Sequence, residues 1–227
     1  MQISCTFTNE DVKMLRVENH ASRSSCPIPF EMDDNRDAKL VFASVLFADI
    51  KGFTRFCQAV DLPSAFHALS AFHRRMAQVV SRFSATVISN TGDEVMAAWC
   101  GTPSAVSSKA LRCGFAMLES VEAWNREDRS HRPGLNIGVG LHAGPVVLGQ
   151  IPGLSESRMS VFGDTVNTAS RLEQMTRAYS TDLIASDELV RMASAITPAE
   201  GGANRLHSAI TAKVRDRAGL LSIRISV

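Results

Sequence analysis

The sequence predicts an α/β sandwich in which helices flank a mixed, mainly antiparallel sheet. Three observations predict this fold class. The run LVFASVLFADI is nearly continuous in apolar residues and has the length of a strand buried on both faces. Two later segments repeat apolar residues at helical spacing. Apparent hairpins interrupt the alternation of strands and helices, which favours a mixed sheet over a doubly wound parallel one.

Composition limits the kind of protein this can be. The chain has 227 residues and is 45% hydrophobic, enough for one well-buried core. Lys and Arg total 24 against 23 for Asp and Glu, so bulk charge indicates neither nucleic acid nor a membrane as a partner. There is no secretory signal pattern and no apolar run of the roughly 20 residues that a membrane span needs. The five scattered cysteines indicate reduced thiols in a cytoplasmic protein and no zinc site.

The expected boundary between an arm and a folded domain lies near residue 39. Residues 1–38 have mixed polarity without a sustained period and are expected to form an N-terminal arm or linker. Residues 39–227 are expected to form a single domain, which begins with the buried strand that closes at Asp49 and Ile50.

The first half of the domain should contain a strand, a long helix and a hairpin. The helix begins near Leu62, and its buried face is expected to carry residues spaced by three or four: Phe66, Leu69, Phe72, Met76, Val79 and Phe83. The segments ATVIS and EVMAAW flank the turn residues 90–93, which predicts two strands joined by a tight turn.

The second half continues with a helix from Pro103 to about Trp124. LNIGVGLHAG and PVVLGQI are expected to form another pair of strands, with glycines at the turn between them. SRMSVFGD then leads into a helix, TVNTASRLEQMT. A short strand at Asp182–Ala185, a short helix and two terminal strands complete the prediction.

Two carboxylates stand at the ends of predicted strands. Asp49 closes the first buried strand, and Asp93 lies in the hairpin turn. A carboxylate at the end of an apolar strand is costly unless a cation meets it, and two such groups at neighbouring strand ends suit hard divalent ions. Taken singly, each is equally well explained as an ordinary turn residue or strand terminator.

A glycine follows the first carboxylate within Ile50-Lys51-Gly52-Phe53-Thr54. Gly52 allows a sharp turn into a helix whose first N–H groups would face the same site, and such a helix start binds phosphate. A metal pair beside a phosphate-binding helix start is a more specific combination than either feature alone.

The segment that follows Gly163 places two polar residues on one helix face. Asn167 and Arg171 are separated by four residues, so an amide and a guanidinium project together and can hold a sugar and a phosphate. Spacing alone favours an exposed polar stripe in which Arg171 pairs with Glu173 or with solvent, because such pairs are common. Of the histidines, His67, His73 and His142 are expected to be structural.

These segments together resemble the class III adenylyl and guanylyl cyclases. The matching blocks are FADIKGFT, NTGDEVMAAW, GVGLHAGPVVLGQI and VFGDTVNTASRLE, which occur in the family's order over roughly residues 40 to 190. The resemblance implies a ferredoxin-like α/β fold that acts as a head-to-tail homodimer. It also implies cyclisation of a nucleoside triphosphate with two Mg²⁺ or Mn²⁺ ions per active site.

The same resemblance assigns roles to residues. It implies that Asp49, Asp93 and the Ile50 carbonyl hold the metal ions. It implies that Asn167 orients the ribose and Arg171 stabilises the transition state, both from the opposite subunit. The backbone of four successive residues would receive the β- and γ-phosphates: Lys51, Gly52, Phe53 and Thr54. One basic residue of the tail would also meet the phosphates, and the candidates are Arg215, Lys213 and Arg217.

The base-reading positions depart from the family pattern. They lie three residues before Gly92 and Gly163, where this chain has Ser89 and Ser160 instead of the charged residues that read a purine edge. The loss of this pattern, shared with a clade of small bacterial cyclases in antiphage defence, slightly favours UTP or CTP over ATP, with GTP last. That resemblance also implies a separate effector that senses the cyclic nucleotide.

Three other interpretations remain at this point. The chain could be an inactive cyclase-like domain for dimerisation or sensing, although both halves of the expected site are present. A diguanylate-cyclase-like enzyme would need a G-G-[DE]-E-F turn, which residues 90–94 lack. A purely structural α/β domain would leave the combined motifs unexplained.

Overall fold

A computed structural model describes residues 38–127, 134–151, 158–195, 203–217 and 219–226. Its strands are β1 (Lys39–Ile50), β2 (Val87–Thr91), β3 (Glu94–Cys100), β4 (Ile137–Ile151), β5 (Arg158–Phe162), β6 (Leu183–Ser186), β7 (Ile210–Lys213) and β8 (Leu220–Ile225). Its α-helices are α1 (Phe53–Ala59), α2 (Leu62–Ser81), α3 (Pro103–Arg126), α4 (Asp164–Ala178) and α5 (Asp187–Ser194). The expected arm lies almost wholly outside the described residues, so its boundary stays a prediction.

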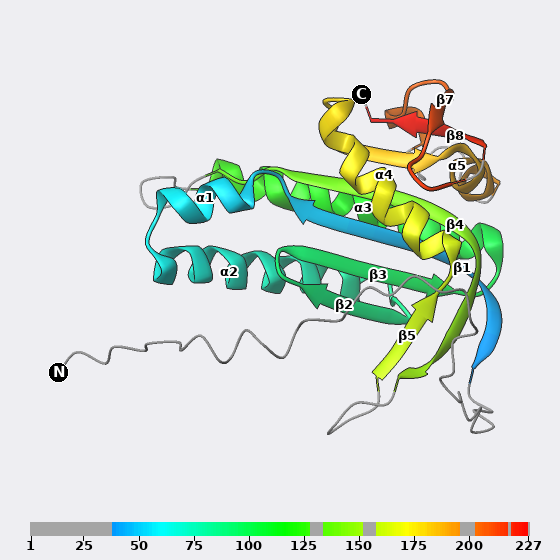
Figure 1. Ribbon diagram of the computed structural model, residues 1–227, viewed down its shortest axis with the longest axis horizontal. Helices are drawn as coiled ribbons and strands as arrows, with labels where there is room; N and C mark the ends of the chain where they lie inside the picture. The colour runs from blue at the N-terminus through cyan, green and yellow to red at the C-terminus, as the bar shows by residue number, and fades with distance from the viewer. Residues whose placement is uncertain (1–37, 128–133, 152–157, 196–202, 218, 227) are drawn as a thin grey trace, which may run out of the picture. The chain divides into compact units, whose positions relative to one another are not determined.

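The strands form one mixed sheet in the order β2-β3-β1-β4-β6-β8-β7, with β5 paired to β4. Every described pairing is antiparallel except that of β4 with β6. Figure 1 shows α3 and α4 on opposite faces of the central strands β1 and β4. The predicted mixed, mainly antiparallel α/β fold is therefore confirmed.

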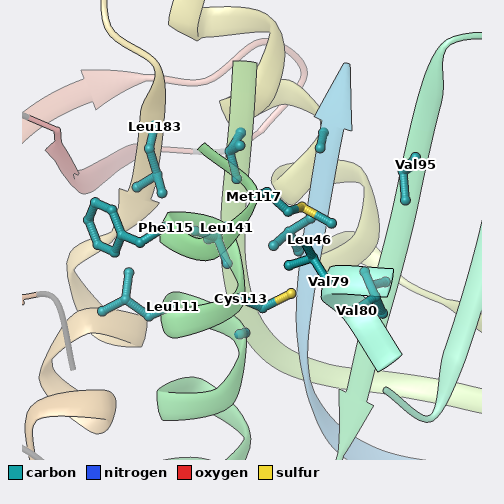
Figure 2. Close-up of a cluster of buried hydrophobic side chains, with 14 of the residues drawn as sticks. Leu46, Val79, Val80, Val95, Leu111, Cys113, Phe115, Met117, Leu141 and Leu183 are labelled. Carbon is teal, nitrogen blue, oxygen red and sulfur yellow. The ribbon is translucent and has the colours of Figure 1, made fainter. Parts of the chain in front are cut away.

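The main core lies between the sheet and the helices α2, α3 and α5. Alternate residues of β1, such as Leu46 and Ile50, point into it, and Met117 of α3 packs from the other side (Figure 2). The intervening residues of β1 face the opposite side, where a second cluster includes Val45 and Ala169 of α4. Asp49 lies four residues after Val45, so strand alternation directs its side chain to the same face, which α4 covers.

The long helix α2 begins where the sequence predicted, because Asp61 caps it. The Asp61 carboxylate accepts a hydrogen bond from the Ser64 amide at 2.9 Å. The expected buried face is only partly correct, since Phe66 is exposed and Phe83 follows the end of the helix. Ala65 is buried in place of Phe66, which lies one residue, or about 100°, off the apolar stripe. Among the described helices, none is long and apolar enough to span a membrane.

The predicted strand pair at residues 135–151 is wrong, because this segment forms one continuous strand. β4 pairs with β1 without a break from Ile137 to Leu148. Its glycines therefore do not form a turn. Gly138, Gly140 and Gly144 lie on the same face, and a Cβ at any of them would meet α4.

Close packing of α4 is the physical reason for these glycines. A Cβ on Gly140 would lie 2.1 Å from the backbone nitrogen of Glu173 and 2.3 Å from the carbonyl oxygen of Ala169. At Gly144 it would lie 2.7 Å from the Thr165 hydroxyl, which donates to the Pro145 carbonyl. The helix backbone thus rests directly on the strand, and this contact fixes where the side chains of α4 project.

Candidate active site

The two carboxylates singled out in the sequence come together at one end of the sheet. Antiparallel pairing of β1 with β3 places Asp49 opposite Glu94, and Asp93 precedes Glu94 in a turn where Gly92 has a φ of 58°. Burial, followed by the hydrogen bond with Asp49 and the negative charge of Asp49, raises the pKa of Asp93 to about 6. His73 contacts the Gly92 carbonyl through Nε2 at 2.8 Å, which is a structural role of the kind expected for it.

Two more carboxylates lie near this pair. Burial, followed by the charges of Asp49 and Asp93, raises the pKa of Glu94 above its ordinary value. Burial also raises the pKa of Glu173 on α4 to about 7, although the nearby guanidinium of Arg177 acts in the opposite direction. This end of the sheet therefore concentrates negative charge that a cation would stabilise.

Arg177 is the cation that meets these carboxylates in the structure. Its Nη2 donates to Asp49 Oδ2, and its Nη1 donates to Glu173 Oε1 at 3.2 Å. Sequence reasoning missed this residue. The spacing of Glu173 and Arg177, four residues apart on a helix, is the signal that could have indicated their ion pair. Nothing in the sequence alone links Arg177 to Asp49, because that contact depends on how α4 crosses the sheet.

The residues present fit a divalent metal ion of the Mg²⁺ or Mn²⁺ kind. Two carboxylates, Asp49 and Asp93, are held against each other, and the backbone carbonyl of Ile50 follows directly. Within the described ranges, no group of three or more His, Cys, Asp or Glu side chains is arranged to hold a metal ion by itself. Such an incomplete protein ligand set suits Mg²⁺, which usually retains waters and binds substrate phosphates as well.

The turn after β1 has the geometry expected of a phosphate-binding helix start. Gly52 adopts a left-handed conformation, with φ 77° and ψ 19°, and α1 begins at Phe53. The side chain of Lys51 points elsewhere, since its Nζ donates to the Thr181 carbonyl at 2.9 Å and to Asp182 at 2.5 Å.

The amide of Lys51 is also occupied, because it donates to the Asn136 carbonyl at 2.8 Å. Of the four residues expected to receive phosphate, this leaves the amides of Gly52, Phe53 and Thr54 at the open end of the helix.

Asn167 and Arg171 lie on the side of α4 that faces away from the sheet. The buried residues of α4 include Ala169 and Leu172, whereas Asn167 is exposed. At about 100° per residue, Arg171 and Arg177 project about 120° apart around the helix axis. Arg171 pairs with Asp216 at 3.3 Å rather than with Glu173. A single chain therefore brings Asp49 and Asp93 together but directs Asn167 and Arg171 elsewhere.

The three basic residues of the tail have different surroundings. Arg217 donates to Asp164 at 2.7 Å and to the Thr168 hydroxyl at 2.9 Å, which ties the tail to the start of α4. Arg215 is largely exposed, and among the described residues its ion pair is with the carboxylate of its neighbour Asp216, at 3.4 Å. Lys213 is exposed at the end of β7. Arg215 is thus freer than Arg217 to meet a phosphate.

The two serines expected to face the base lie on neighbouring strands. Ser89 is exposed on β2, and Ser160 is partly buried on β5, where it is opposite Gly149. Figure 1 shows β5 beside β2, and these two strands are in contact. The strands that carry the two serines therefore belong to the same region of the sheet.

Comparisons with known proteins follow the same segments. The family model "Adenylate and Guanylate cyclase catalytic domain" matches residues 39–193. "Adenylate cyclase 1" of Rhizobium meliloti (strain 1021) is 33% identical over 151 residues, which is 65% of this chain and 23% of that protein. "Adenylate cyclase" of Anabaena cylindrica is 27% identical over 153 residues, again 65% of this chain and 30% of that protein. This chain thus spans less than a third of either relative.

A solved structure described as the guanylyl cyclase Cya2 has a similar fold. Its TM-score is 0.71 at 21% sequence identity, and the match covers 84% of this chain and 93% of that chain. At this level of identity the likeness is one of fold. It extends beyond the residues of the family match and supports the described arrangement of the sheet.

Proposed function

The chain belongs to the adenylate and guanylate cyclase catalytic domain family, and we propose that it cyclises a nucleoside triphosphate to a 3′,5′-cyclic nucleotide with release of pyrophosphate. One observation carries the proposal. Asp49 and Asp93 meet at the end of the sheet, directly beside a helix start that opens with a left-handed glycine. Paired carboxylates next to free helix amides are what a metal-bound triphosphate requires.

The proposed chemistry divides among few groups. Asp49, Asp93 and the Ile50 carbonyl would hold two Mg²⁺ or Mn²⁺ ions, which would lower the pKa of the ribose 3′-hydroxyl and neutralise charge on the departing phosphates. The amides of Gly52 and Phe53 would donate to the β- and γ-phosphates.

The remaining proposed contacts come from Thr54, whose amide would also donate to the triphosphate, and from Arg215 of the tail. Asn167 would hold the ribose, and Arg171 would meet the charge that develops on the α-phosphoryl oxygens.

The second half of the site would come from a second copy of the chain. Asn167 and Arg171 point away from the sheet face that carries Asp49, so one chain does not unite the two sets. An exposed apolar row also crosses three neighbouring strands. Leu40 of β1 pairs with Val147 of β4, which pairs with Phe162 of β5, and all three are exposed. An exposed patch of this kind supports a homodimer.

Complementation between inactive variants tests the shared site. Asp49→Ala and Arg171→Ala chains should each lose cyclase activity as homodimers. A heterodimer of the two would contain one site with both residues intact and one with neither, so about half of the wild-type activity should return. The measurement is cyclic-nucleotide formation by a heterodimer isolated with two different affinity tags.

Two controls make this test specific. An Asp49→Ala/Arg171→Ala double variant mixed with wild type should add no cyclase activity to that of the wild-type sites. Arg205→Gln, which alters an exposed arginine paired with Glu119, should remain active alone and in mixtures. An inactive heterodimer whose composition and folding have been verified would contradict the shared site.

ATP is the first candidate substrate, and a pyrimidine triphosphate is the second. The relatives named as adenylate cyclases favour ATP, and this reverses the slight preference for UTP or CTP drawn from Ser89 and Ser160. The serines favour the second candidate because a hydroxyl can donate or accept but supplies no charge for a purine edge. Competition among all four triphosphates at equal concentration, followed by identification of the products, shows whether the enzyme prefers ATP or a pyrimidine triphosphate.

The cellular setting of the reaction remains a prediction. A part in antiviral signalling and an effector that senses the product rest on the sequence resemblance, and a cytoplasmic location rests on the scattered cysteines. Identification of the cyclic product tests the signalling role first. Cyclic UMP or cyclic CMP would favour the antiviral setting, and cyclic AMP would favour general signalling.

A further inference from the structure

Arg177 connects two carboxylates that come from different elements of the fold. Its guanidinium lies between Asp49 at the end of β1 and Glu173 on α4, with one terminal nitrogen directed at each. This arginine takes no part in the roles proposed above for nucleotide or phosphate. Its position nevertheless places a fixed positive charge on an oxygen of Asp49, the carboxylate proposed to bind the metal.

The two ends of this bridge differ in burial. The Glu173 side chain is 2% exposed, whereas the Asp49 side chain is 19% exposed and lies beside the open end of the sheet. A buried carboxylate that loses its cation is strongly destabilised, while a carboxylate near solvent can exchange partners at much lower cost. Burial therefore favours keeping the guanidinium on Glu173, at 3.2 Å, and makes the contact with Asp49, although it is the shorter of the two, the end that can exchange with a cation from solvent.

A divalent ion bound between Asp49 and Asp93 would face this same guanidinium. Both cations are attracted to the Asp49 carboxylate, and they repel each other at close range. We propose that Arg177 competes with the divalent metal for Asp49, so that metal binding displaces Nη2 while Nη1 remains on Glu173. This inference rests on the proposed metal site, and it makes Arg177 a residue that sets the metal affinity.

An alternative role for Arg177 predicts the opposite change in metal affinity. An arginine that merely oriented Asp49 for the metal would strengthen metal binding, as outer-shell partners of metal ligands generally do. Competition predicts that removal of the guanidinium tightens metal binding, whereas orientation predicts that removal weakens it. The sign of the change therefore decides between the two roles.

The experiment is a titration of the full-length protein with Mn²⁺ alone, followed by the electron paramagnetic resonance signal of free Mn²⁺. Arg177→Gln should bind Mn²⁺ about two to five times more tightly than wild type, the range expected when a partly exposed ion pair no longer opposes binding. Arg205→Gln is the matched control, because Arg205 is equally exposed, at 43%, and pairs with Glu119 away from the site. Its Mn²⁺ affinity should equal that of wild type.

A second variant keeps the test valid if Arg177→Gln is unstable. Glu173→Gln/Arg177→Gln removes the buried carboxylate together with its cation, so only the more exposed Asp49 carboxylate loses a partner, and it should show the same tighter binding. Unchanged or weaker Mn²⁺ binding in a folded variant of either kind would overturn the proposal.

Asp49→Asn separates failure of this inference from failure of the proposed function. If Asp49→Asn removes Mn²⁺ binding but the Arg177 variants do not tighten it, the competition is wrong and the metal site stands. If Asp49→Asn leaves Mn²⁺ binding unchanged in both the wild-type and the Arg177→Gln background, the metal site itself is wrong, and the competition falls with it.

Discussion

His142 is a buried side chain on the face of β4 that α4 covers, between Gly140 and Gly144. Its Nδ1 has no hydrogen-bond partner among the described residues. Burial, followed by the charge of Arg217, lowers the pKa of His142 to about 4, although Asp164 acts in the opposite direction. The folded protein therefore holds this imidazole neutral, in agreement with the structural role expected from the sequence.

This pKa shift predicts a pH dependence of stability. An unfolded chain protonates His142 below its ordinary pKa of about 6.5, whereas the folded chain does so only near 4. The free energy of unfolding should therefore fall as pH drops from 6.5 towards 4, by roughly 2 kcal/mol between pH 7.5 and 5 from this residue alone. Urea unfolding of wild type and His142→Phe at both pH values measures this fall in the free energy of unfolding.

The contribution of His142 is the difference between the two proteins, since carboxylates such as Asp93 and Glu173 titrate in both. Wild type should lose more stability than His142→Phe on acidification. An equal loss in the two proteins would show that the imidazole is protonated as readily in the folded state as in the unfolded state.

At the scale of elements, the contact of β4 with α4 controls the geometry of the site. Gly138 and Gly140 permit this contact in different ways. A Cβ on Gly140 would meet backbone atoms of α4, at 2.1 and 2.3 Å, whereas a Cβ on Gly138 would first meet the side-chain oxygens of Thr176 and Glu173, at 2.4 and 2.6 Å. Side-chain ends can rotate away, but a helix backbone can only move as a unit.

Gly140→Ala should consequently destabilise the protein more than Gly138→Ala. The expected loss for Gly140→Ala is about 3 kcal/mol or more, at the upper end of the range for overpacked cores, against roughly 1 kcal/mol for Gly138→Ala. Thermal and urea unfolding of the two variants measure the difference. Equal losses would mean that α4 moves as easily as the side chains of Thr176 and Glu173.

The sequence was sufficient to predict most elements but not this contact. Continuous apolar runs and helical spacing predicted β1, α2 and α3, because these signals are local. Glycines in GVGLHAG have two local explanations, a turn or close packing, and only the tertiary fold distinguishes them. The same limit applies to the site. Asp49 and Asp93 stand at recognisable strand ends, whereas Arg177 reaches Asp49 only because α4 lies so close to the sheet.

At the scale of the whole molecule, the proposed active site requires two copies of the chain. The exposed row of Leu40, Val147 and Phe162 is the apolar surface that supports this assembly. Phe162→Glu should weaken the dimer by at least tenfold, because a charge replaces an aromatic side chain within the row.

Sedimentation over a range of concentrations measures the dissociation constant of each variant. Leu62→Glu is the control, since Leu62 is also exposed but lies at the start of α2, outside the row. Equal dissociation constants for Phe162→Glu and wild type would exclude this row from the interface. The comparison is independent of activity, so it tests assembly separately from catalysis.

The central claim is that this chain cyclises a nucleoside triphosphate at a metal site built on Asp49 and Asp93. The most direct measurement incubates the purified protein with Mn²⁺ and each of the four ribonucleoside triphosphates in turn, with products identified by mass spectrometry. The account predicts a 3′,5′-cyclic nucleotide and an equal amount of pyrophosphate from at least one triphosphate, and a loss of at least a hundredfold in folded Asp49→Asn. No cyclic product from any triphosphate, or undiminished turnover in Asp49→Asn, would contradict it.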